Sequence, residues 1–265
     1  MDRGRKNTLL FLPYTQQRTC ASVGDRICST PSGTRADMCA SKGVDDTSAG
    51  ALLMQFIYVL DPMCSWCWAF QRSFSDLTAQ YPEIPTQYLL GGLAPDTDEP
   101  MPSELRTKLQ DIWRHIEAKT GTPFNHAFWQ NNTPRRSTWR ACRAVILAED
   151  VGTSSAEMVA AIQQAYYTQA LNPSDRSTLV DICRKLGGDA ELFSQKLDDP
   201  ETQEALNQHR QLASQLGADG FPALLLAIED KVYPITYGYT DGAALITRTR
   251  QIISEASLKS RKAPE

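Results

Sequence analysis

Residues 55–70 read QFIYVLDPMCSWCWAF, and this stretch decides the fold. Residues 55–60 form a short, mostly apolar run that is rich in strand formers, which indicates a buried β-strand ended by a proline-containing turn. Residues 65–80 carry apolar side chains at helical spacing and predict a helix of about four turns. Cys64 and Cys67 therefore lie at the point where a strand gives way to a helix.

The pattern outside this stretch completes an α/β arrangement. A second strand is predicted over 85–90, so strand, helix and strand follow one another within about 40 residues as a βαβ unit. From about 101 to 217 the apolar stripes are helical and predict six helices. Strand character returns at 223–228 and at 232–237, and Asp241 is expected to cap a last helix.

This order predicts a thioredoxin fold with a four-stranded mixed sheet and a large all-helical insertion. Residues 54–100 and 218–257 would form the thioredoxin core, and residues 101–217 would form the helical insertion domain. Pro234 lies inside the last predicted strand. Because proline cannot donate a ladder hydrogen bond, this strand is expected at an edge of the sheet.

Residues 1–53 form a different kind of sequence, with three cysteines, scattered Gly, Ser, Thr and Arg, and no sustained period. Such a segment cannot bury enough apolar surface to offset its ordering entropy, so we expect a mostly disordered leader. Its Arg-rich start makes a transit peptide the alternative, while the apolar run 9–12 is too short for an export signal. Met54 directly precedes the first strand, and we expect the functional protein to begin near it.

Composition and charge exclude several classes of protein. The 265 residues are 42% hydrophobic and 22% charged, which is ordinary for a globular chain. A net charge of −4 offers no basic surface for a nucleic acid or an anionic membrane. No apolar run reaches the roughly 18–20 residues that span a bilayer. The seven cysteines, irregularly spaced, do not form a secreted disulfide framework, which predicts a reducing compartment, the cytoplasm.

Cys64 and Cys67 are separated by two residues, so they can close a small disulfide. Unpaired N–H groups and the helix dipole favour negative charge at the start of a helix. Because the thiolate is the reactive form, this position should lower the pKa of Cys64, which we expect to be an exposed nucleophile. Cys67 lies one turn further in, should be more buried, and is suited to resolve a mixed disulfide.

Two other uses of the cysteine pair are disfavoured. A c-type haem site needs His after the second cysteine, where this chain has Trp68. Structural zinc normally needs a second ligand pair, and the remaining Cys and His residues form no closely spaced pair. No metal or organic cofactor is therefore implied. Cys142 and Cys183 lie on apolar helix stripes and are expected to be inert.

The run 61–70 resembles the active-site segment of the DsbA-like branch of the thioredoxin superfamily, and most closely that of the FrnE-like dithiol–disulfide isomerases. The resemblance covers about 54–257. It implies a thioredoxin fold that carries a helical insertion. It also implies that Cys64 is the attacking cysteine and that Cys67 is the resolving one.

The resemblance further implies a cis-proline opposite the disulfide, at Pro222. The backbone of Phe221 would then face the disulfide and pair with a substrate chain. The alternative is a trans proline that opens an edge strand. The family usually has a smaller or β-branched residue before this proline, so Phe221 leaves substrate preference open. Ser65-Trp66 replaces the Pro-His of strongly oxidising members, so we expect a couple less oxidising than the roughly −120 mV of DsbA.

The sequence also predicts the surroundings of four further side chains. Trp66 is predicted to contact substrate, since exposed aromatic residues anchor peptides. Trp68 is predicted to pack in the core. Asp61 is expected to be a turn residue, with tuning of the thiol pair or proton relay as the alternative. His209 lies on an apolar helix face and should be packed or partly exposed.

The leading hypothesis is a protein-disulfide oxidoreductase or isomerase that uses Cys64 and Cys67 and no cofactor. Its partners would be proteins with thiols or disulfides, with glutathione as a further candidate. The main alternative is a glutathione-dependent enzyme resembling the kappa-class transferases and the chromene-carboxylate isomerases. Those enzymes typically rely on a single Ser or Cys, and the presence of Cys67 argues against them. A third hypothesis is a non-catalytic module that binds peptides beside Pro222.

Overall fold

The computed structural model describes residues 52–260, so the predicted leader lies outside the described residues except for its last two. Four strands form one sheet in the order β2-β1-β3-β4: β1 (Met54–Leu60), β2 (Thr86–Leu90), β3 (Ala223–Ile228) and β4 (Lys231–Tyr237). β1 and β2 are parallel, while β3 is antiparallel to both β1 and β4. The sheet is mixed as predicted, and Pro234 lies in the edge strand β4.

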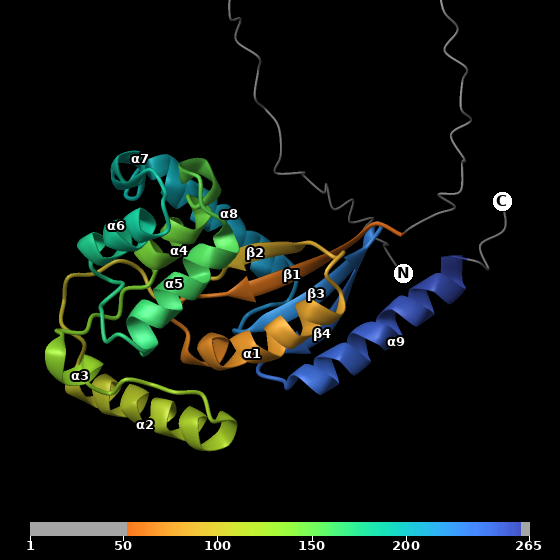
Figure 1. Ribbon diagram of the computed structural model, residues 1–265, viewed down its shortest axis with the longest axis horizontal. Coiled ribbons are helices and arrows are strands. Elements are labelled where there is room, and N and C mark those ends of the chain that lie inside the picture. Colours follow the sequence, from red (N-terminus) through yellow and green to blue (C-terminus); the bar gives the residue numbers. More distant parts are fainter. Residues whose placement is uncertain (1–51, 261–265) are drawn as a thin grey trace, which may run out of the picture. The chain divides into compact units, whose positions relative to one another are not determined.

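Helix α1 (Ser65–Gln80) joins β1 to β2, and α9 (Gly242–Ser260) follows β4. Figure 1 shows most of the helices between β2 and β3 beyond one end of the sheet, the last of them extending beside β2, and α1 and α9 beside the sheet. They are α2 (Ser103–Thr120), α3 (Phe128–Asn131), α4 (Trp139–Ile146), α5 (Ser155–Tyr167), α6 (Arg176–Lys185), α7 (Ala190–Lys196) and α8 (Pro200–Gln215), with a 3-10 turn at Glu149–Val151. This is the predicted thioredoxin fold with a helical insertion, although α3 and the 3-10 turn were not predicted. None of the helices in residues 52–260 is both long and apolar enough to cross a bilayer.

Successive residues of β1 pack on opposite faces of the sheet, as the alternation of a strand requires. Tyr58 faces α1, where its ring centroid lies 4.7 Å from that of Phe74 and 5.6 Å from that of Phe70. Ile57 and Val59 point to the other face and belong to a separate apolar cluster. Burial on both faces explains why this strand is apolar almost throughout.

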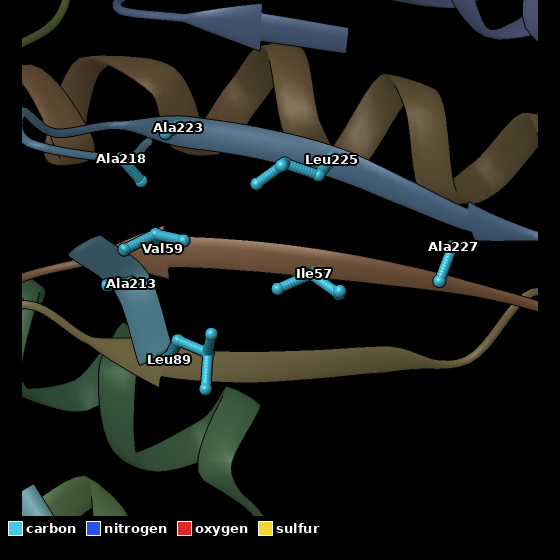
Figure 2. Packing of buried hydrophobic residues seen from close by; sticks show 8 residues of the cluster. All are labelled: Ile57, Val59, Leu89, Ala213, Ala218, Ala223, Leu225 and Ala227. Carbon is cyan, nitrogen blue, oxygen red and sulfur yellow. The ribbon is translucent and has the colours of Figure 1, made fainter. Parts of the chain in front are cut away.

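The second cluster joins the sheet to α8. Figure 2 shows small and branched side chains of β1, β2 and β3 packed beside α8; the buried members are Ile57, Val59, Leu89, Ala213, Ala218, Ala223, Leu225 and Ala227. By sequence position α8 falls within the predicted insertion 101–217, yet it packs directly on the sheet. The division of the chain into core and insertion domain stays a prediction.

Side chains cap the starts of both α5 and α9, and the cap of α9 by Asp241 was predicted. The N–H of Glu157 donates to the Ser154 hydroxyl at 3.2 Å, and the N–H of Ser154 donates to the Glu157 carboxylate at 3.0 Å, which completes a capping box at α5. The N–H of Ala244 donates to the Asp241 carboxylate at 2.9 Å at the start of α9. These bonds satisfy N–H groups that a helix end otherwise leaves unpaired.

A buried arginine that no sequence pattern predicts links α4 to its neighbours. Arg143 is 3% exposed. Its guanidinium donates to the carbonyl of Leu197 at 2.8 Å, to Asp96 at 2.7 Å, to Gln203 at 2.7 Å and to Asp198 at 2.8 Å. Because Asp96 follows β2 and Gln203 lies in α8, this side chain links three separate parts of the chain.

Candidate active site

The two cysteines lie at the start of α1. Cys64 is the residue before the helix and has an extended backbone, while Cys67 lies in the first turn. Cys67 is 0% exposed and Cys64 is 8% exposed, so the predicted order of burial is confirmed. The prediction that Cys64 is exposed is wrong, because a loop distant in sequence covers it. The Cys64 sulfur lies 3.8 Å from the carbonyl oxygen of Phe221 in that loop.

The two thiols have opposite pKa shifts. A hydrogen bond from the Cys67 thiol lowers the pKa of Cys64, although burial and the charge of Asp61 oppose this. Burial raises the pKa of Cys67 well above its ordinary value, and the neighbouring Cys64 adds to the increase. A thiolate at Cys64 beside a protonated Cys67 is the arrangement in which the first sulfur attacks and the second follows.

The segment facing Cys64 contains a cis peptide bond between Phe221 and Pro222, as the family resemblance implied. The ring and the carbonyl group of Phe221 contact different parts of the protein. It packs on Gly91 at the end of β2 so closely that a methyl group on Gly91 would lie 1.8 Å from a ring carbon. The ring thus covers the end of β2 while the backbone faces Cys64. No pattern in the sequence predicts this contact, because Gly91 and Phe221 are 130 positions apart.

Asp61 is a turn residue as predicted, and it is also fully buried beneath the site. Its carboxylate accepts the N–H of Met63 at 2.8 Å, which forms the turn. It also accepts the N–H of Leu93 at 2.7 Å, the Thr138 hydroxyl at 2.6 Å and the Cys142 thiol at 3.5 Å. Burial raises the pKa of Asp61. The carboxylate therefore joins the cysteine loop to α4 and places charge near both active-site thiols.

Trp66, between the cysteines, is half-buried and lines a groove of about 660 Å³ along one face of α2. Its ring contacts Tyr239 at 5.6 Å and His115 at 6.0 Å between centroids. The ammonium of Lys119 lies 5.5 Å from the ring centroid. Trp66 is therefore held between α2 and the segment after β4, beside the candidate nucleophile.

Other predicted residues have different surroundings. Trp68 is half-buried rather than part of the core, because its N–H reaches out to the carbonyl of Pro123 at 3.0 Å while its ring stacks on Tyr167. Cys142 and Cys183 are buried, as expected for cysteines on apolar stripes. Within residues 52–260, no group of three or more His, Cys, Asp or Glu side chains could hold a metal ion.

The family model of the DSBA-like thioredoxin domain matches residues 57–241. Among solved structures, a proposed protein disulfide isomerase from Nitrosomonas europaea is 26% identical, with a TM-score of 0.67 over 76% of this chain and 98% of that chain. The cytosolic disulfide reductase DsbM from Pseudomonas aeruginosa is 23% identical, with a TM-score of 0.61 over 77% of this chain and 98% of that chain. A 2-hydroxychromene-2-carboxylate isomerase, 14% identical, shares the fold, with a TM-score of 0.52 over 79% of this chain and 99% of that chain. The search of curated proteins finds no match.

Proposed function

Because the chain belongs to the DSBA-like thioredoxin domain family, we propose that it exchanges disulfides through Cys64 and Cys67. The supporting observation is the opposite pKa shift of two adjacent thiols at the start of α1. The Cys64 thiolate attacks one sulfur of a substrate disulfide, forms a mixed disulfide and releases one substrate thiolate. Cys67 then loses its proton, attacks the Cys64 sulfur and releases the second thiolate. Two electrons pass to the substrate, and the reverse sequence oxidises a dithiol.

Three residues would hold the substrate chain. The backbone of Phe221 beside the cis bond to Pro222 faces the Cys64 sulfur and offers main-chain hydrogen bonding. Trp66 offers an aromatic surface at the mouth of the groove along α2. We assign proteins with thiols or disulfides as the substrate class, with glutathione as a second candidate. A solved structure of DsbM from Pseudomonas aeruginosa with GSH, 23% identical to this chain, supports glutathione as the second candidate.

The cysteine usage of the chain supports a reducing compartment, and we propose the cytoplasm. In that setting the enzyme would act mainly as a reductase or isomerase. Ser65-Trp66 between the cysteines supports the same direction, because neither residue supplies an imidazole that would stabilise the Cys64 thiolate further.

Trapping of a mixed disulfide tests the proposal. Cys67→Ala should accumulate a covalent adduct at Cys64 with a peptide disulfide, detected by intact mass, because no second thiol can release it. Cys183→Ala, which removes a buried cysteine outside the pair, should release product as the unaltered protein does. Activity that survives Cys67→Ala and requires glutathione would contradict the proposal and favour a transferase or isomerase.

A further inference from the structure

Arg210 of α8 carries a charge that no other described residue neutralises. Its guanidinium carbon lies 4.5 Å from the centre of the Trp139 ring, in a cation–π contact. Its side chain has no ion pair or hydrogen bond with the rest of the described chain. The arginines of α4 differ in this respect, since Arg140 and Arg143 both form ion pairs with Asp198.

Glycine at position 92 allows this stacked pair to lie against the end of β2. Gly92 has a left-handed backbone, with φ of 63°, and a methyl group there would lie 2.8 Å from the Trp139 ring and 3.3 Å from Cδ of Arg210. The Trp139 N–H also donates to the carbonyl of Gly92 at 3.3 Å. The ring is therefore fixed in place beneath the guanidinium.

The stacked pair is connected to the candidate active site by direct contacts. Gly92 follows Gly91, and Gly91 packs against the ring of Phe221. The carbonyl of Phe221 in turn faces the Cys64 sulfur. Phe221 and its neighbour Gly91 thus stand between Cys64 and the stacked pair, and a substrate joined to Cys64 could pass along Phe221 to Arg210.

We propose that Arg210, held on Trp139, binds a carboxylate of the substrate whose sulfur reacts with Cys64. This inference rests on the proposed function and names the substrate chemistry that it prefers. A guanidinium presents a planar fork of N–H donors that matches two carboxylate oxygens, and stacking through its face leaves those edge donors free.

A pair of matched disulfides tests this site in the full-length protein. Glutathione disulfide carries free carboxylates on its glycine and γ-glutamyl residues, and the fully esterified ethyl ester masks all of them. We would measure the rate constant of the reduced protein with each and compare the acid-to-ester ratio. Arg210→Gln should lower that ratio about tenfold, as expected for loss of a bidentate charged contact. Arg250→Gln removes an exposed arginine of α9 and should leave the ratio unchanged.

The ratio is independent of how much of the variant is folded, because both rates scale with the active fraction. Peptide disulfides with Glu or Gln near the cysteine distinguish the source of the carboxylate. If Arg210→Gln lowers the ratio of the rate constants for the Glu and Gln peptides, the site binds carboxylates of protein side chains. If the variant affects only the reaction with glutathione disulfide, the site binds carboxylates of small thiols. If Arg210→Gln changes neither the acid-to-ester ratio nor the Glu-to-Gln ratio, the inference is wrong. A wild-type protein that reacts with none of these disulfides overturns the proposed function as well.

Discussion

At the scale of single residues, the site depends on charges close to two sulfur atoms. Residue type and spacing alone predict the pair Cys64 and Cys67 and their order of burial. They do not predict that Cys64 is covered, because the covering group is the carbonyl of Phe221, from a segment beyond the whole helical insertion. The full role of Asp61 was hidden for the same reason, since its partner Thr138 lies far along the chain.

Asp61→Asn should lower the pKa of Cys64 further. The buried carboxylate disfavours a thiolate nearby, and its charge raises the pKa of both active-site thiols. We expect alkylation of Cys64 at mildly acidic pH to become about three- to tenfold faster, measured with iodoacetamide. The variant should also lose about 1–3 kcal/mol of stability, because an amide NH₂ cannot accept all the donors that surround the carboxylate.

Thr138→Val separates the charge of Asp61 from its hydrogen bonding. This variant removes one donor to the carboxylate but keeps the carboxylate itself. It should therefore be less stable than the wild type, while the alkylation of Cys64 should be no faster. Equal alkylation rates in wild type and Asp61→Asn would show that the carboxylate does not influence the nucleophile.

His209 should make stability depend on pH. Burial lowers the pKa of His209 to about 4, and the N–H of Leu90 donates to its Nδ1 at 3.3 Å. Between pH 6.5 and about 4 the unfolded chain binds a proton that the folded chain does not, so stability falls as the pH drops through this window. His209→Gln should remove about 1–3 kcal/mol of that decrease, measured by urea unfolding at several pH values. Identical pH profiles for the two proteins would exclude this role.

At the scale of elements, apolar periodicity predicted the four strands and most of the helices. It could not predict α3, because four residues are too short to display a helical period. The burial of α3 comes from tertiary contact instead, since the ring centroids of Trp129 and Trp113 lie 4.8 Å apart. Capping signals were more informative, because a side chain that bonds its own helix depends only on local sequence.

Ser154→Ala should destabilise the protein by about 1 kcal/mol, because the first turn of α5 loses the side-chain acceptor of its capping box. Thermal unfolding monitored by circular dichroism would measure this. The neighbouring Ser155 makes only a 3.5 Å contact with Glu149, so Ser155→Ala should change stability by less than about half as much. Equal losses in the two variants would contradict the capping role.

At the scale of the whole molecule, the order of elements was enough to predict the mixed sheet and the place of the insertion. The way in which the insertion is attached was not predictable, because the partners of Arg143 come from two segments distant in sequence, Asp96 after β2 and residues 197–203. A buried arginine on an amphipathic helix gives no sequence signal of its own. The packing of α8 on the sheet was missed for a related reason, since Leu212 and Ala213 of α8 pack against strand residues that lie far away in the sequence.

Arg143→Met should reduce stability by about 1–3 kcal/mol, because Asp96, Asp198 and the Leu197 carbonyl lose their buried donor. Guanidinium unfolding would measure the loss. Arg184 pairs with Asp181 on the surface, where its side chain is 62% exposed, so Arg184→Met should cost well under about 1 kcal/mol. Similar midpoints for Arg143→Met and the unaltered protein would contradict a structural role for this network.

The contact between Gly91 and Phe221 constrains how this loop can be redesigned. The two residues lie on either side of the helical insertion in the sequence, yet the Phe221 ring fills the space that a side chain at position 91 would need. A smaller residue at 221 alone would leave a void above the strand end, and alanine at 91 alone would force the aromatic ring out of place. Any attempt to graft the loop of a relative onto this scaffold must therefore exchange both positions together.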